Sequence, residues 1–237
     1  FDFYALTTTC TQIDLLRLFE GGFSTGHGFL REPQSIASYA ALAAIAIQSN
    51  QNDQHGGQGV PNFDYAMADG VAKTFIKNYE AKLVESLEDL TEVPNETAFV
   101  QSLLAQAVAK QGHAARLSAG RDDADAAAFD HAVVALLTDS GKVGPAAAQR
   151  IVSSSRRRAE RATDRATYQA MEGFVHNLNT MHSRAGAQTP FSSINYGTDT
   201  TPEGRMAIRN ILLATDAGLG HGETAIFPIH IFKVKEG

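Results

Sequence analysis

The sequence predicts an α/β fold that is rich in helices and contains parallel strands. The last part of the chain, residues 189–234, has the pattern of a strand, a helix and a second strand. Such a βαβ unit joins parallel strands by a right-handed crossover. The first part, residues 1–48, also passes from a strand-like run into helical segments, and residues 97–182 have helical periodicity throughout. A chain of 237 residues can bury a large core around such a sheet.

The N-terminal part begins with residue types that favour a strand. Residues 1–10, FDFYALTTTC, are aromatic and β-branched, and residues 11–22 predict a short amphipathic helix that ends at two glycines. A glycine-containing loop follows at 23–31. Pro33 suits the first position of a helix that we expect to end near Gln48. We expect its buried face to consist of Ile36, Ala40, Ala43, Ala44 and Ile47.

The middle of the chain predicts one long polar loop and then mostly helices. Residues 49–62 have the composition of the loop, and residues 63–90 carry an apolar stripe at helical spacing. Three or four helices follow over 97–182, and the Ala- and Asp-rich part at 117–150 has the character of a surface excursion. Six arginines fall within 150–165. They predict either a solvated helix face or a surface for a partner or a phosphate.

The composition excludes several classes of protein. The formal net charge of −6 argues against a general nucleic-acid binder, which would usually be basic. There is neither a signal peptide nor an apolar run long enough for a membrane span. The single cysteine permits no internal disulfide, which is typical of the reducing cytoplasm. The chain starts inside a strand-like run and stops just after another, so we expect it to be a piece of a longer protein.

The common sequence signatures of metal and nucleotide sites are absent. The eight histidines do not combine with cysteine or carboxylates at metal-ligand spacing, and His176 and His182 are six residues apart, which is not one face of a helix. No GxGxxG motif, Walker loop or nucleophile elbow occurs. We therefore predict no metal site in this chain.

Small hydrogen-bonding residues crowd the end of the predicted strand 189–196. They are Ser192, Ser193, Asn195, Gly197, Thr198 and Thr200. Ligands of α/β sheets bind at the carboxyl ends of strands, and a helix N-terminus attracts anions. Here a helix begins at once, with Thr200 or Thr201 as its cap, Pro202 in its first turn, and Glu203 completing a capping box with Thr200. The pattern predicts an anion site, or hydroxyl groups that only cap and turn the chain.

Three blocks of sequence carry a resemblance to a known family. They are residues 7–36 (TTTCTQIDLLRLFEGG onward), residues 47–75 (IQSNQNDQHGGQGVPN onward) and residues 167–237, which contain HSRAGAQTPFSSINYGTDTTPEGR. In this order they resemble the anaerobic (class III) ribonucleoside-triphosphate reductases. The stretch 110–160 lies outside the resemblance and is treated as a variable helical excursion.

The resemblance implies a fold and a reaction. The fold is a ten-stranded α/β barrel made of two half-barrels, and residues 1–237 would form the first half of this catalytic domain. The reaction reduces ribonucleoside triphosphates to deoxyribonucleotides for DNA synthesis. A radical-SAM activase makes a glycyl radical, which passes to a finger-loop cysteine, and formate is the usual reductant. ATP and deoxynucleotides are the expected effectors, and a cytoplasmic homodimer is the expected assembly.

The resemblance also implies roles for single residues. Cys10 matches a catalytic cysteine that lines the pocket, so we expect it inside the barrel near the carboxyl end of its strand. Without the resemblance, the residue type favours the alternative that Cys10 is a small, buried hydrophobic side chain. Lys77 is a candidate allosteric phosphate contact, and the helices after Pro33 and Phe63 are the expected dimer contact. The candidate substrate-binding residues are Ser192, Ser193, Asn195, Gly197 and Thr198.

The departures from the family pattern concern segments that this sequence does not contain. One cysteine cannot be both Cys10 and the finger-loop radical cysteine. The four-cysteine zinc site, the glycyl radical motif and the ATP-cone are likewise missing, and we expect them elsewhere in a longer protein. The leading hypothesis is therefore that this chain is part of an anaerobic reductase and is inactive by itself. The alternatives are a nucleotide-binding or interaction module without catalysis, and another type of glycyl radical enzyme.

Overall fold

The computed structural model describes residues 10–26, 28–54, 56–92, 95–120, 123–182 and 186–234. The chain divides into two compact units. The sheet unit consists of Phe1–Val71 and Ala166–Gly237, and the helical unit consists of Ala72–Arg165. Apart from Cys10, the strand predicted at 1–10 lies outside the described residues.

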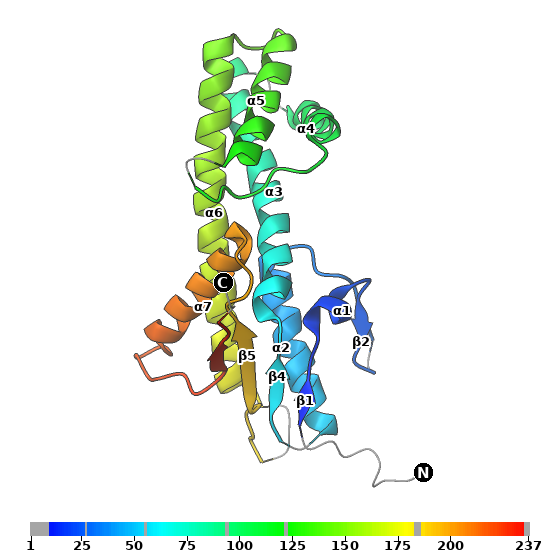
Figure 1. Cartoon of the computed structure of the whole chain (residues 1–237), viewed down its shortest axis with the longest axis vertical. Helices are drawn as coiled ribbons and strands as arrows, with labels where there is room; N and C mark the ends of the chain where they lie inside the picture. Colours follow the sequence, from blue (N-terminus) through cyan, green and yellow to red (C-terminus); the bar gives the residue numbers. More distant parts are fainter. Residues whose placement is uncertain are drawn as a thin grey trace. The chain divides into compact units, whose positions relative to one another are not determined.

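The sheet unit is built on four parallel strands in the order β1-β4-β5-β6 (Figure 1). They are β1 (Thr11–Gln12), β4 (Gln58–Val60), β5 (Ser192–Tyr196) and β6 (Ile229–Phe232). The predicted parallel βαβ unit near the C-terminus is confirmed, because α7 (Pro202–Ala217) connects β5 to β6. Strand β4 is a correction, since residues 49–62 were predicted as a loop. Gln and Gly favour strands weakly, so only the pairing with both neighbours identifies this one.

The helices of the N-terminal part agree with the sequence pattern more closely than the loops do. Helix α1 (Leu15–Phe19) begins at the cap Asp14 and is followed by two glycines with positive φ. Helix α2 (Ile36–Asp53) begins after a capping box of Ser35 and Ser38, so Pro33 lies before the helix and not in its first position. All five residues predicted for its inner face are buried. The predicted loop 23–31 contains a short antiparallel hairpin, β2 (Phe23–Ser24) and β3 (Phe29–Leu30).

The two faces of the sheet differ in cover. On β5, Ser192, Ile194 and Tyr196 are buried, whereas Ser193 and Asn195 are half-buried, as expected for side chains that alternate between faces. Figure 1 shows α2 and the last part of α6 (Pro145–Thr180) behind the strands. The register places Gln12, Gly59, Ser193 and Ile229 in one row on the other face, and Asn195 and Ile231 in the next row. We call this second face the open face.

The helical unit contains parts of two long helices and two shorter ones. These are α3 (Phe63–Thr91), α4 (Thr97–Gln111), α5 (Ala124–Asp139) and α6, all in segments predicted to be helical. Its core includes the apolar stripe of α3 predicted from periodicity, in which Phe75, Tyr79, Leu83 and Leu87 are all buried. In the described parts of the chain, no helix combines the length and apolar character needed to cross a membrane.

Candidate functional site

The turn between β5 and α7 is the centre of the predicted anion site. Thr201 caps α7, because its side chain accepts a hydrogen bond of 3.1 Å from the backbone N–H of Gly204. Pro202 occupies the first turn, as predicted, but the cap is Thr201 and not Thr200. The turn therefore leads directly from the carboxyl end of a parallel strand into a helix N-terminus.

The backbone of this turn already binds an anion, and that anion belongs to the protein. The N–H groups of Gly197 and Asp199 donate to the same carboxylate oxygen of Asp64, over 2.8 and 3.0 Å. Asp64 lies in the first turn of α3 and is only 1% exposed. The Tyr65 hydroxyl donates to the carbonyl oxygen of Thr198 over 3.0 Å. The backbone donors of Gly197 and Asp199 are therefore already occupied by a carboxylate of α3.

Two further features fix the turn. Gly197 has φ +116°, and a Cβ there would lie 2.5 Å from the Lys233 carbonyl oxygen and 2.8 Å from the Phe232 ring. Its lack of a side chain thus lets β6 approach, whereas we expected it to make room for a phosphate. The buried Asp199 accepts a 2.9 Å hydrogen bond from the N–H of Thr201, and its carboxylate fills the space where Gly204 has no side chain.

Strand alternation separates the predicted substrate residues into two groups. Ser193 and Asn195 lie on the open face, where they share rows with Ile229 and Ile231. Ser192 is buried on the covered face, in register with Gln58. The structure thus brings Ser193 and Asn195 together and directs Ser192 away from them.

Cys10 differs in position from the prediction. It directly precedes β1 at the amino end of the strand, and its side chain is exposed. The expectation of an enclosed cysteine at the carboxyl end is therefore not met within the described chain. Thr11 is in register with Gln58, which is in register with Ser192, so the strand that follows Cys10 lies about two strand spacings, roughly 10 Å, from β5.

The residues predicted for regulation and dimerisation lie on two helices. Lys77 is exposed on α3. Helices α2 and α3 pack together as predicted, since a Cβ at Gly70 would lie 2.9 Å from the Tyr39 ring and 3.1 Å from the Ile36 Cα atom. Of the alanines on α2 predicted to serve close helix contact, Ala40 and Ala44 are buried inside the unit, whereas Ala37 and Ala41 are exposed.

His230 on β6 is a half-buried titratable group that the sequence did not single out. Its two ring nitrogens lie 3.1 Å from the Tyr196 hydroxyl and 3.1 Å from the Thr215 hydroxyl. Burial lowers the pKa of His230 below its usual 6.5 and raises the pKa of Tyr196. Its partners are far away in the sequence, so no local motif could have identified it.

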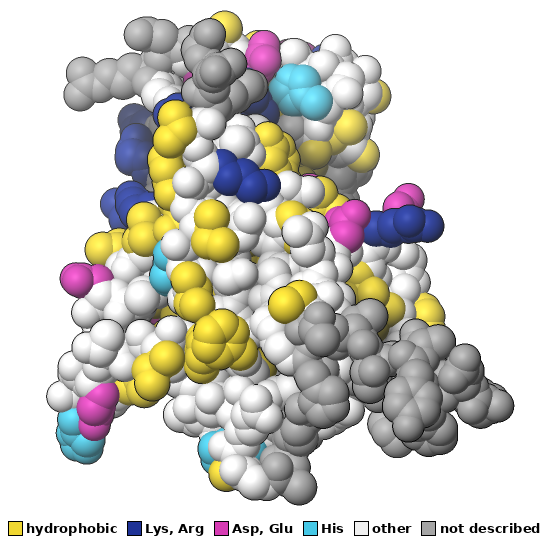
Figure 2. All heavy atoms as spheres, turned by 60° about the horizontal axis from the view of Figure 1, so that its bottom comes forward, with side chains coloured by type: hydrophobic (Ala, Val, Ile, Leu, Met, Phe, Trp, Pro, Cys, Tyr) yellow, Lys and Arg dark blue, Asp and Glu magenta, His cyan; other side chains and the backbone are white. Residues whose placement is uncertain are grey.

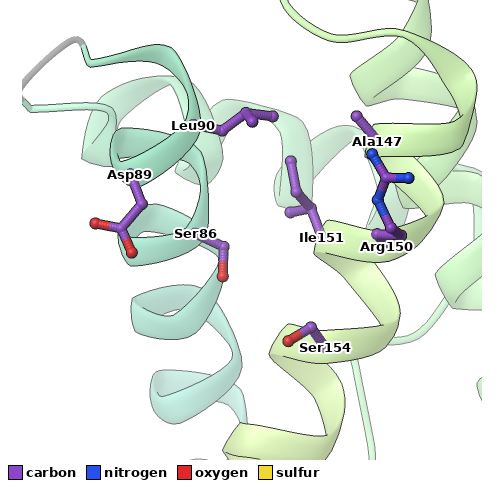
Figure 3. A pocket seen from close by; sticks show the side chains of 7 residues that line it. All are labelled: Ser86, Asp89, Leu90, Ala147, Arg150, Ile151 and Ser154. Atoms are coloured by element: carbon purple, nitrogen blue, oxygen red, sulfur yellow. The ribbon is translucent and has the colours of Figure 1, made fainter.

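Each unit also has a pocket. In the helical unit a pocket of about 300 Å³ lies between α3 and α6 (Figure 3), lined by Ser86, Asp89, Leu90, Ala147, Arg150, Ile151 and Ser154. In the sheet unit another, also about 300 Å³, lies beside the carboxyl end of β1. Its lining is Ile13, Leu18, Phe23, Ser24, Thr25, Ala46, Ser49 and Asn50. Among the described residues, no three His, Cys, Asp or Glu side chains gather as a metal site would require.

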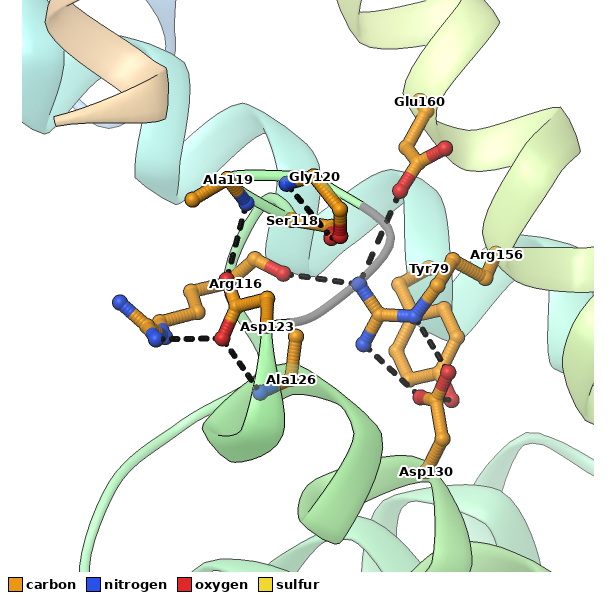
Figure 4. A network of polar contacts seen from close by, with 10 residues as sticks. All are labelled: Tyr79, Arg116, Ser118, Ala119, Gly120, Asp123, Ala126, Asp130, Arg156 and Glu160. Carbon is orange, nitrogen blue, oxygen red and sulfur yellow. Dashed lines mark hydrogen bonds and ion pairs between the residues drawn. The ribbon is translucent and has the colours of Figure 1, made fainter.

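The arginine-rich part of α6 is not a uniformly solvated face. Arg156 is 9% exposed, and its guanidinium group makes two hydrogen bonds to the Asp130 carboxylate of α5 (Figure 4). The Tyr79 hydroxyl donates to the same carboxylate over 2.8 Å. Burial and the nearby Asp130 raise the pKa of Tyr79, and burial raises that of Glu160. Arg157, Arg161 and Arg165 are exposed, as a solvated helix face predicts.

Comparisons with known proteins give one consistent result. The sequence model of the family "Anaerobic ribonucleoside-triphosphate reductase" matches residues 1–237. The enzyme of that name from Escherichia coli K12 is 35% identical over 229 residues, which are 96% of this chain and 23% of the relative. The one from bacteriophage T4 is 24% identical over 231 residues, 97% of this chain and 27% of the relative. The one from Salmonella typhimurium is 21% identical over 229 residues. The chain thus spans about a quarter of the length of these relatives.

Proposed function

The chain belongs to the anaerobic ribonucleoside-triphosphate reductase family, and we propose that it is part of an enzyme that reduces ribonucleoside triphosphates to deoxyribonucleotides in the cytoplasm. The observation that carries the proposal is the match of the family over residues 1–237. The E. coli relative, at 35% identity over nearly the whole chain, supports it. No feature of the described residues favours the alternative of a nucleotide-binding module without catalysis.

We propose that the open face of the sheet is the substrate side. It combines the polar side chains of Ser193 and Asn195 with Ile229 and Ile231, which are 43% and 42% exposed. Figure 2 shows hydrophobic side chains uncovered on one face of the molecule. An apolar sheet face needs a second layer to cover it. In our proposal the chain is the first half of a ten-stranded barrel, and the second half provides this cover.

The geometry refines the roles proposed for the substrate-binding residues. Ser193 and Asn195 contact the nucleotide from the open face, and the Thr198 side chain contacts its phosphates at the end of β5. The N–H groups of Gly197 and Asp199 already donate to Asp64, so phosphate binding here relies on hydroxyl groups. Ser192 and Gly197 support the site from behind, through packing against β4 and β6.

We further propose that Cys10 is the catalytic thiol that this chain contributes. Its exposure leaves the thiol accessible, and it directly precedes β1, which belongs to the same sheet as Ser193 and Asn195. A glycyl radical made by a radical-SAM activase, with formate as reductant, would supply the radical and the reducing electrons from outside these 237 residues. The zinc site of the family is likewise expected outside them.

Regulation is proposed for the helices. Lys77 would contact the phosphates of a deoxynucleotide effector, with ATP as a further effector. Helices α2 and α3 would form a homodimer contact, for which Ala37, Ala41 and the 38% exposed Ile45 provide a surface of small and apolar residues on α2.

The test uses the full-length protein, activated under anaerobic conditions, with each of the four ribonucleoside triphosphates as substrate. Formation of deoxyribonucleotides is expected, and Asn195→Ala should lower kcat/KM by about tenfold or more, because it removes polar contacts to the substrate. The matched control is Asn78→Ala on α3, whose side chain bonds Thr163 inside the helical unit. Absence of deoxyribonucleotide formation by the activated wild-type protein would overturn the proposal.

A further inference from the structure

We infer that Asp64 is a positioning residue, which holds the β5–α7 turn in the conformation that presents Thr198 to the substrate phosphates. The inference rests on the proposed function. It concerns a residue in the first turn of α3, which lies 133 residues before the turn that it binds.

Two neighbouring residues of α3 hold three successive residues of the turn. One oxygen of the Asp64 carboxylate accepts from the N–H groups of Gly197 and Asp199, over 2.8 and 3.0 Å. Between them, the carbonyl oxygen of Thr198 accepts from the Tyr65 hydroxyl over 3.0 Å. The backbone on both sides of the Thr198 side chain is thus fixed by α3, and the side chain itself takes no part in these contacts.

A carboxylate suits this position better than a neutral group. Asp64 is 1% exposed, so its charge has little contact with water and depends on the hydrogen bonds that it accepts. Hydrogen bonds to an ionised acceptor are about twice as strong as neutral ones. An asparagine would offer one acceptor oxygen and an NH₂ group. The second Asp64 oxygen accepts from the N–H of Tyr65 over 3.1 Å, so an NH₂ group placed there would face another donor.

The hydrogen bonds that begin at Asp64 continue through Asp199 to the first turn of α7. Asp199, whose N–H is bound to Asp64, accepts through its own carboxylate from the N–H of Thr201, the cap of the helix. The Asp199 carboxylate also occupies the space beside Gly204. A displacement of the Asp64 carboxylate therefore moves Thr198, the cap and the first turn of α7 together.

These contacts predict which kinetic constant depends on Asp64. The carboxylate is buried behind the turn and its accepting oxygen is used by two N–H groups, so it acts through Thr198. Phosphates far from the reacting ribose bind equally in the ground state and in the transition state, and loss of such binding raises KM with kcat unchanged. A residue that only stabilised the fold would lower the amount of active enzyme and leave KM as it is.

The experiment compares Asp64→Asn and Tyr65→Phe in the full-length, activated enzyme with a saturating effector and a varied ribonucleoside triphosphate. We expect KM to rise about tenfold for Asp64→Asn and about threefold for Tyr65→Phe, with kcat within about twofold of wild type. In the double variant, KM should rise by less than the product of the two single-variant increases, because both residues hold the same turn. Asp216→Asn, which removes an exposed carboxylate from α7, is the charge-matched control and should retain the wild-type KM.

A wild-type KM in Asp64→Asn overturns the inference. If Asp64→Asn does not fold, Tyr65→Phe decides alone, because the Tyr65 side chain is 40% exposed and its truncation leaves the packing intact. A wild-type KM in that variant then overturns the inference. An inactive wild-type enzyme would instead overturn the proposed function, so the two failures are distinguishable.

Discussion

The sheet unit has a buried carboxylate and the helical unit a half-buried one, and the two accept hydrogen bonds from different kinds of group. In the sheet unit, Asp64 accepts from backbone N–H groups of the β5–α7 turn. In the helical unit, Asp130 accepts from the side chains of Arg156 and Tyr79. A carboxylate bound to backbone determines the path of a loop, whereas one bound to side chains connects helices whose backbones are already satisfied. The first arrangement therefore fixes a turn, and the second stabilises the packing of helices.

The units also differ in how completely they cover their apolar side chains. Tyr79, Phe129 and Val133 of the helical unit are buried among its own helices. On the open face of the sheet unit, Ile229 and Ile231 remain more than two-fifths exposed. The unit that carries the proposed substrate residues is thus the one that leaves a layer of its sheet uncovered.

The largest expected loss of stability comes from breaking the side-chain network of Asp130, Arg156 and Tyr79 in the helical unit. Asp130→Ala would remove the hydrogen-bonded carboxylate of the buried Arg156 guanidinium, which lies over the rings of Phe75 and Tyr79 at 5.4 and 5.3 Å and would keep the longer 3.8 Å ion pair with Glu160. Breaking a buried ion pair in this way costs about 3–5 kcal/mol of unfolding free energy. The measurement is native-state hydrogen exchange of α5 and of residues 145–165 in the full-length protein.

The control is Asp125→Ala on the same helix. The Asp125 side chain is 72% exposed and pairs with Arg116 at 3.2 Å, and such a surface ion pair contributes at most about 1 kcal/mol. Equal losses in the two variants would show that the buried network does not stabilise the helical unit, and the proposed contrast with Asp64 would fail.

A pair of glycines gives the next largest effect, one in each unit. Gly197 and Gly141 have φ of +116° and +73°, and both are strained by any side chain. At Gly141 an added Cβ meets open space, so Gly141→Ala should cost about 1 kcal/mol. At Gly197 the Cβ also meets Lys233 and Phe232, so Gly197→Ala should cost about 2–3 kcal/mol.

Thermal unfolding of the two variants of the full-length protein measures this difference. The sheet unit should show the larger loss, together with reduced hydrogen-exchange protection of β6. Equal losses of stability in Gly197→Ala and Gly141→Ala would mean that β6 moves away freely from the added methyl group. Gly197 would then have no packing role.

Local pattern predicted the helices well, because periodicity and capping are properties of neighbouring residues. The stripe on α3 and the β5–α7–β6 unit are examples. Strand β4 was missed because Gln58, Gly59 and Val60 resemble a loop, and only their pairing with β1 and β5 makes them a strand. The hairpin of β2 and β3 was missed for the same reason.

The sequence could indicate where small polar residues gather, but not which contacts they make. The polar end of β5 and the start of α7 are adjacent in sequence, so their pattern indicated a site. Asp64 gave no sequence signal, since its partners are more than 130 residues away. Arg156 likewise looks the same in sequence as the exposed Arg161, and only the approach of Asp130 from α5 distinguishes it.

The smallest expected effect concerns pH, and its sign differs between the units. Burial lowers the pKa of His230 in the sheet unit, so the folded state binds its proton less readily than the unfolded state. The stability contributed by neutral His230 is present above pH 6.5 and is lost as the pH falls below that value. Burial raises the pKa of Glu160 in the helical unit above 4.5, so its contribution is present below pH 4.5 and is lost as the pH rises through the folded value.

Hydrogen exchange on the full-length protein, corrected for intrinsic rates, can separate the two contributions between pH 7.5 and 4.5. As the pH falls, protection of β6 should decrease in wild type and should decrease less in His230→Gln, which cannot titrate there. Over the lower end of that range, protection of residues 145–165 should decrease less in wild type than in Glu160→Gln, because only the titrating carboxylate gains a proton in the folded state. Both changes should be smaller than those of either glycine variant, since His230 and Glu160 are each partly open to water and keep polar neighbours in both protonation states. If His230→Gln and wild type lose protection of β6 in parallel, the pH sensitivity of the sheet unit arises from other groups.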